Sequence, residues 1–183
     1  MAFAVWFTGL PGSGKTVIAS STAAIMKKND INVKMLQLDE IRRVLTPNPK
    51  YTDEERDIVY TSLGYMAKLL TESGVNVFID ATANRRKYRD AARSIIPEFA
   101  EIYIRCSLDV CMAREARRKA VFSPKNIYKK SARAGANVPG VNVPYEEPID
   151  PLIIIDSDKM NPEKSAEKAA HAIISMFGEK HGN

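Results

Sequence analysis

The sequence is poor in the residues that build disulfide frameworks, zinc sites and membrane spans. It contains two cysteines, two histidines and one tryptophan among 183 residues. No Cys/His cluster accompanies Cys106 and Cys111, so we expect two buried thiols rather than a zinc site. No apolar run approaches the ~20 residues of a membrane span, and the N-terminus lacks the pattern of a signal peptide. We therefore expect a cytoplasmic protein without membrane contact.

A glycine-rich segment near the N-terminus is the most informative motif that the chain does have. Residues 9–16 read G-L-P-G-S-G-K-T, which fits the phosphate-binding loop G-x-x-x-x-G-K-T. Glycines allow successive backbone amides to point at phosphate oxygens, and the N-terminus of the following helix attracts the same anion. Lys15 would reach the β- and γ-phosphates, and the Thr16 hydroxyl would bind Mg²⁺. The predicted ATP site comprises Gly9, Leu10, Pro11, Gly12, Ser13, Gly14, Lys15 and Thr16.

Segments typical of strands and helices alternate along the chain, which favours a parallel sheet covered by helices on both faces. The expected strands are residues 3–8, 33–38, 75–81, 99–106 and 152–156. The expected helices are residues 14–28, 53–73, 85–96, 108–119 and 163–177. The fold class is therefore α/β, a three-layer α/β/α P-loop NTPase with a five-stranded parallel sheet, in a single domain spanning residues 1–183.

Positive charge is concentrated between Arg114 and Arg133, where eight basic residues accompany one acid, Glu115. Such a segment is commonly a solvated helix face or a nucleic-acid patch. Beside a phosphate loop it also fits a lid that closes positive charge over a triphosphate. We favour a lid over residues 114–147, with Arg114 binding ATP, and charge alone leaves nucleic-acid binding open.

Two acidic residues stand at predicted strand ends. Asp39 ends the second strand and Arg42 follows one helical turn later, so a carboxylate and a cation could serve an anionic hydroxyl acceptor together. The simpler alternative for Asp39 is a helix N-cap. Asp80 follows three apolar residues of the third strand, a Walker B pattern that places a carboxylate near Mg²⁺. The alternative for Asp80 is a cap at the end of the strand.

Further cations and one aromatic residue flank these strand ends. Tyr51 and Arg56 could stack on a base and bind phosphate, although Tyr51 alone is commonly a packing residue. Arg85, Arg86 and Arg89 lie on the predicted helix 85–96 and could touch the substrate. A charged, exposed helix face is the simpler interpretation of these three arginines.

Late segments of the chain resemble a known family. Residues 126–135 read N-I-Y-K-K-S-A-R-A-G and residues 144–148 read P-Y-E-E-P. They look like the G-L-Y-K-K-A-R-A-G and P-Y-E-x-P segments of adenylylsulfate kinases, and residues 89–93 look like that family's R-D-x-A-R. The resemblance runs from Val5 to about Asp158. It implies a nucleoside-monophosphate-kinase-like, dimeric enzyme that uses MgATP to phosphorylate the 3′-hydroxyl of adenosine 5′-phosphosulfate.

The resemblance also implies roles for single residues. It gives Asp39 the role of activating the acceptor. In the in-line transfer that we predict, Lys15, Mg²⁺ and a lid arginine such as Arg114 or Arg133 would neutralise charge on the transferred group. The resemblance implies that the substrate is bound by Asp39, Arg42, Tyr51 as an adenine clamp, Arg56 and Lys125. We add Thr82 as a predicted substrate-binding residue.

The acceptor site departs from the family pattern while the ATP loop matches it. Gln37 and Leu38 replace the first Asp and the Gly of D-G-D, and Val59 replaces an asparagine. Residues 81–84 replace F-I-S-P, and either Val138 or no residue stands at the second aromatic clamp.

Residues 80–85 instead resemble the D-A-T-x-x-R strand end of kinases similar to polynucleotide 5′-kinase. Another hydroxyl acceptor, a modified nucleotide or a nucleic-acid 5′ end, therefore stays open. So does a nucleotide-binding switch without enzyme activity, although Asp39 and the basic lid argue against it.

Overall fold

Five parallel strands form the central layer of the molecule in the computed structural model, which describes residues 1–117, 126–132 and 136–178. Their order across the sheet is β2-β3-β1-β4-β5. Each neighbouring pair is parallel. The bounds are β1 Ala4–Thr8, β2 Val33–Gln37, β3 Asn76–Asp80, β4 Phe99–Arg105 and β5 Ile153–Asp156. The predicted five-stranded parallel sheet is confirmed.

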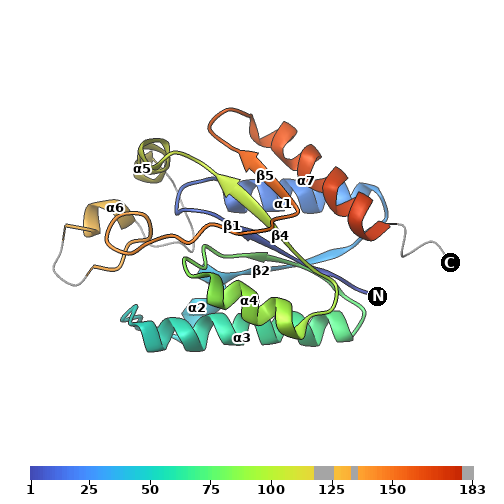
Figure 1. Cartoon of the computed structure of the whole chain (residues 1–183), viewed down its shortest axis with the longest axis horizontal. Coiled ribbons are helices and arrows are strands. Elements are labelled where there is room, and N and C mark those ends of the chain that lie inside the picture. Colours follow the sequence, from blue (N-terminus) through green and yellow to red (C-terminus); the bar gives the residue numbers. More distant parts are fainter. Residues whose placement is uncertain (118–125, 133–135, 179–183) are drawn as a thin grey trace.

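Helices cover both faces of this sheet (Figure 1). The helices α1 (Lys15–Lys28) and α7 (Pro162–Phe177) pack on one face, and α3 (Asp53–Glu72) and α4 (Arg86–Ile95) pack on the other. The fully buried β1 alternates between the two cores. Ala4 and Trp6 join the cluster beneath α3 and α4, whereas Val5 and Phe7 join the cluster beneath α1 and α7. A strand buried on both faces reads as a continuous apolar run, as this one does.

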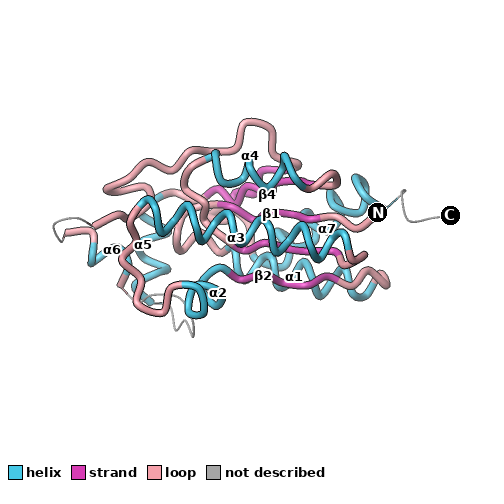
Figure 2. Tube along the Cα trace, turned by 90° about the horizontal axis from the view of Figure 1, so that it is seen from below, coloured by secondary structure: helices cyan, strands magenta, loops and turns pink. Residues whose placement is uncertain are grey.

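Three shorter helices lie at the end of the molecule where the strands have their carboxyl ends (Figures 1 and 2). They are α2 (Leu38–Leu45), α5 (Leu108–Arg117) and α6 (Ile127–Lys130). The sequence did not predict α2, and the position assigned to Asp39 was wrong. The strand β2 ends at Gln37, which is also the N-cap residue of α2, so Asp39 lies in the first turn of that helix. A carboxylate there is favoured by the positive helix N-terminus.

Local sequence signals account for the ends of the longer helices. Thr52 caps α3 by accepting a hydrogen bond of 3.2 Å from the Glu55 amide. Asn161 caps α7 in the same way, and Pro162 occupies its first turn. Gly74, with φ of +80°, follows the C-terminus of α3 and allows the chain to turn into β3. Among the helices of the described residues, none is both long enough and apolar enough to cross a bilayer.

Candidate active site

The phosphate loop joins β1 to α1 and packs tightly against the rest of the site. A Cβ atom on Gly9 would lie 2.3 Å from the Ile104 carbonyl oxygen, and one on Gly12 would lie 2.4 Å from the Cys111 carbonyl oxygen. Both glycines also have positive φ, +151° and +81°. Only glycine fits at these two positions, so β4 and α5 fix the curvature of the loop.

Two side chains of the loop are suited to an anion. Lys15 is buried, and its Nζ donates to the carbonyl oxygens of Gly9 at 3.0 Å and Leu10 at 2.9 Å. The Ser13 hydroxyl is buried without a hydrogen-bond partner in the described structure. A buried polar group without a partner costs free energy, and a phosphate oxygen would supply that partner. The loop therefore fits a polyphosphate.

The two predicted metal ligands come together. The Thr16 hydroxyl donates to Asp80 Oδ2 at 2.6 Å, although they belong to α1 and β3. Asp80 is buried at the end of its strand, beside Phe7 of β1. A hydroxyl and a carboxylate beside a phosphate loop are oxygen ligands of the kind Mg²⁺ prefers. The residues present therefore fit the expected ion.

Arg114 projects from α5 to the phosphate loop. It donates to the Ser157 carbonyl oxygen at 2.7 Å and to the Ser157 hydroxyl at 3.2 Å. That hydroxyl in turn donates to the Ser13 carbonyl oxygen at 2.6 Å. Arg114 thus lies beside the loop, and its ATP contact stays a prediction. The sequence analysis missed Ser157, although its position directly after β5 placed it at the ligand-binding edge of the sheet.

A second cluster of charge lies on α2 and the start of α3. Arg42 is buried, donates to Glu55 Oε1 at 2.9 Å, and lies 5.1 Å from the centre of the Tyr51 ring. Burial raises the pKa of the Tyr51 hydroxyl; the Arg42 charge opposes this shift and the Asp39 charge adds to it. Asp39, Arg42 and Tyr51 therefore share one electrostatic environment.

Arg56 is directed at protein groups. Its guanidinium donates to the Asn137 carbonyl oxygen at 2.6 Å and to Asn84 Oδ1 at 3.4 Å. Asn137 also donates from its side chain to the Tyr51 carbonyl oxygen at 3.2 Å. Arg56 therefore connects α3 with the segment after α6 and with the turn after β3. Sequence reasoning missed both asparagines, although Asn84 lies in the segment that departs from the family pattern.

The other predicted substrate and lid residues have varied positions. Thr82 accepts a hydrogen bond of 2.7 Å from the Thr8 hydroxyl through its backbone carbonyl. Val138 is buried in a small apolar cluster with Cys111 and Tyr128, so it packs and does not offer a surface to a base. The Tyr128 hydroxyl donates to the Pro11 carbonyl oxygen at 2.7 Å and so attaches α6 to the phosphate loop. The predicted contacts of Lys125 and Arg133 lie outside the described residues.

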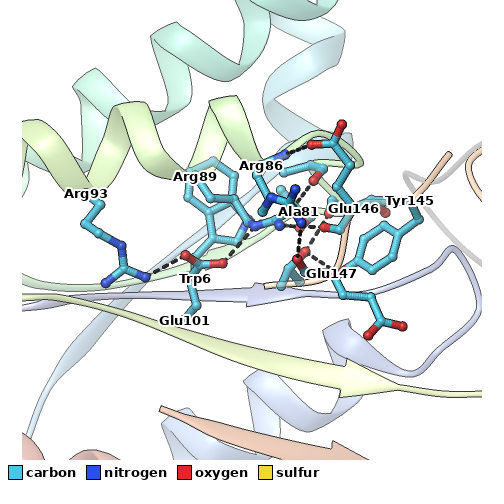
Figure 3. Close-up of polar contacts among 12 residues, drawn as sticks. Trp6, Ala81, Arg86, Arg89, Arg93, Glu101, Tyr145, Glu146 and Glu147 are labelled. Carbon is cyan, nitrogen blue, oxygen red and sulfur yellow. Dashed lines mark hydrogen bonds and ion pairs between the residues drawn. The ribbon is translucent and has the colours of Figure 1, made fainter. Parts of the chain in front are cut away.

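A buried ion pair between α4 and β4 places Arg89 against the last residues of the predicted lid (Figure 3). Arg89 is fully buried and pairs with Glu101 at 2.8 Å, so the expectation of an exposed face was wrong for Arg89. It also donates to the carbonyl oxygens of Ala83 and Glu146, the latter at 2.6 Å. Arg93 contacts the second oxygen of Glu101 at 2.6 Å. The repeated basic residues at helical spacing mark the α4 face that contacts β4, and their partner is an acid within an apolar strand.

The class of the protein follows from this arrangement. A phosphate loop after the first strand, a buried lysine over it, and the pair of Thr16 on α1 with Asp80 at the end of β3 define a P-loop phosphotransferase. The adenylylsulphate kinase family model matches residues 1–156, and the chain belongs to this family.

Individual relatives agree with this family. An adenylyl-sulfate kinase of Halothermothrix orenii is 37% identical over 178 residues, which cover 96% of this chain and 89% of the relative. A probable bifunctional SAT/APS kinase of Sorangium cellulosum is 35% identical over 168 residues, and the match spans only 27% of that longer protein. The structure of the Mycobacterium tuberculosis APS kinase CysC, in complex with AMPPNP and APS, superposes with a TM-score of 0.80. It is 27% identical, and the match covers 94% of this chain and 97% of that one.

Proposed function

We propose that this enzyme transfers the γ-phosphoryl group of ATP to the 3′-hydroxyl of adenosine 5′-phosphosulfate. The observation that carries the proposal is the pairing of an intact phosphate loop with the Arg42–Tyr51 pair at the same edge of the sheet. An arginine stacked with an aromatic ring suits a nucleotide that carries both a base and an anionic group. The solved relative that holds APS and AMPPNP supports the same pair of substrates.

The residues of this chain would divide the work of an in-line transfer. Lys15 would exchange its contacts with the Gly9 and Leu10 carbonyls for the β- and γ-phosphates. Asp39 would orient the acceptor hydroxyl and accept its proton. Thr16 and Asp80 would hold Mg²⁺, which when bound supplies positive charge to the phosphate oxygens. Arg114 would add positive charge from α5.

One observation favours a second acceptor class. The residues that replace the family's F-I-S-P segment form a specific structure: Ala83 has φ of +42°, and Asn84 is buried against Arg56 and the Pro144 carbonyl oxygen. A reshaped turn beside Arg56 would alter the wall of the acceptor pocket. The alternative acceptor is a modified nucleotide or the 5′-hydroxyl of an oligonucleotide.

A panel assay tests the proposal. The protein is incubated with MgATP and adenylylsulfate, adenosine or cytidine nucleotides, or 5′-hydroxyl oligonucleotides, and ADP release is followed. We expect ADP release with adenylylsulfate above all others, and release only with an oligonucleotide would overturn the proposal. Lys15→Ala is the control, because losing this cation should remove turnover with every acceptor. Light scattering on the same sample tests the homodimer that the resemblance implies.

A further inference from the structure

Glu55 occupies the centre of the contacts around Arg42 and Tyr51. It is the third residue of α3, and its carboxylate faces three donors at once. Oε1 accepts from Arg42 at 2.9 Å. Oε2 accepts from the backbone amides of Lys50 at 2.6 Å and Tyr51 at 3.1 Å. One carboxylate thus joins α2, the loop before α3, and α3 itself.

This use of the carboxylate differs from that of an ordinary helix start. In a capping box, a glutamate three residues after a capping threonine turns back to the amide of that threonine. Thr52 does cap α3, but Glu55 accepts instead from the two residues that precede Thr52. Tyr51 has φ of +58°, a conformation that is uncommon for a bulky residue. The hydrogen bonds that the Lys50 and Tyr51 amides donate to Glu55 hold the backbone in this conformation, which places the Tyr51 ring 5.1 Å from the Arg42 guanidinium.

The ion pair between Arg42 and Glu55 is largely buried, which strengthens the attraction between the two charges. The Arg42 and Glu55 side chains are 10% and 13% exposed. An ion pair so little hydrated is screened less than a surface pair, and removing one partner leaves the other charge uncompensated. The geometry of Arg42 therefore depends on Glu55.

We propose that Glu55 is the positioning residue of the acceptor site: it sets the geometry of Arg42 and Tyr51 without touching the reacting atoms. The role in acceptor binding rests on the proposed function. Glutamine is the informative replacement, because its amide has a single accepting oxygen for three donors and turns an NH₂ group toward cations or N–H groups. In Glu55→Gln either Arg42 or the loop amides therefore lose their acceptor.

Steady-state kinetics of Glu55→Gln test the positioning role. We expect the KM for adenylylsulfate to rise roughly ten- to hundredfold, as for loss of a hydrogen bond to a charged group. The KM for ATP should stay within about twofold, because the phosphate loop has no contact with Glu55 among the described residues. Glu54→Gln is the matched control, since it removes the same charge from an exposed position of the same helical turn. An unchanged acceptor KM, a parallel rise of both KM values, or an equal effect of Glu54→Gln would overturn the proposal.

Limited proteolysis separates this inference from the identity of the substrate. Trypsin cleaves the Lys50–Tyr51 peptide bond, and both the Tyr51 amide of that bond and the preceding Lys50 amide donate to Glu55. Glu55→Gln should release the fragment of residues 1–50 faster than wild type and Glu54→Gln, without any substrate present. Unchanged cleavage would overturn the role of Glu55 in holding the loop. A wild-type enzyme that is inactive on adenylylsulfate but shows the expected cleavage would overturn only the proposed acceptor.

Discussion

The Thr16 hydroxyl lies 2.6 Å from Asp80 Oδ2, although 64 residues separate the two in the chain. The sheet order explains this proximity. The strands β1 and β3 are neighbours, and Asp80 pairs in register with Phe7, just before the phosphate loop begins. The carboxylate at the end of β3 therefore lies beside the first turn of α1, the helix that follows β1. The two motifs, distant in the chain, would together hold Mg²⁺ beside a triphosphate bound in the loop.

Asp80→Asn should weaken the binding of Mg²⁺ while leaving the ATP-binding loop intact. The amide keeps the size of the side chain but loses the negative charge that a divalent cation needs. We expect the Mg²⁺ concentration for half-maximal turnover to rise roughly tenfold, equivalent to about 1.4 kcal/mol. A magnesium titration of the kinase assay measures this change. Calorimetry with ATP and a chelator is the control, and wild-type magnesium dependence would show that Asp80 is only a strand cap.

The sequence was sufficient for the features that depend on local pattern. Apolar runs and helical periodicity located all five strands and the long helices, and the G-x-x-x-x-G-K-T motif located the loop. The sequence also predicted that Thr16 and Asp80 lie at one site, because the loop after β1 and the end of β3 share the carboxyl edge of a parallel sheet.

Features that depend on contacts between distant segments were not predictable from pattern alone. The helix α2 follows β2 without any intervening residue, so nothing in the sequence separated the two. Arg89 looked like a surface residue because its partner, Glu101, lies on another element. Glu55 is one of three consecutive acids in the first turn of α3, and its role as a hydrogen-bond acceptor depends on the conformation of Tyr51.

Asp39→Ala tests the proposed role of the carboxylate on α2. If Asp39 accepts the proton of the acceptor hydroxyl, its removal should lower kcat by roughly 10²–10⁴-fold. The affinity for ATP should change little, because that site belongs to the loop after β1. Single-turnover kinetics and calorimetric titration with ATP measure the two quantities. The adjacent exposed Glu40→Gln is the control, and a kcat near that of wild type would reduce Asp39 to a helix-stabilising charge.

Arg89→Met should destabilise the fold strongly. Among the described residues, the change leaves Glu101, which is 4% exposed, with the more exposed Arg93 as its ion-pair partner. Removing one partner of a buried ion pair costs about 3–5 kcal/mol, which corresponds to a melting temperature lower by on the order of 10 °C for a chain of this size. Thermal unfolding followed by circular dichroism measures this change in melting temperature. Arg93→Met should cost less, since Glu101 keeps its buried partner, and equal losses in the two variants would contradict the assignment.

Cys111 should stay unreactive in the folded enzyme at neutral and mildly basic pH. Burial is the main cause that raises the pKa of its thiol to about 12, with a contribution from the neighbouring Cys106 thiol. Because the thiolate is the nucleophile, a raised pKa suppresses alkylation. Mass spectrometry after iodoacetamide treatment at pH 8 should find Cys111 unmodified in native protein and modified in denaturant.

The raised pKa of Cys111 also affects the free energy of unfolding: the unfolded thiol ionises near its ordinary pKa of 9.0 while the folded one stays protonated. The contribution of Cys111 to stability is therefore complete below pH 9 and declines as the pH rises toward 12. Cys111→Ala should remove this part of the alkaline slope, and rapid alkylation of native protein at pH 8 would contradict the burial that underlies both expectations.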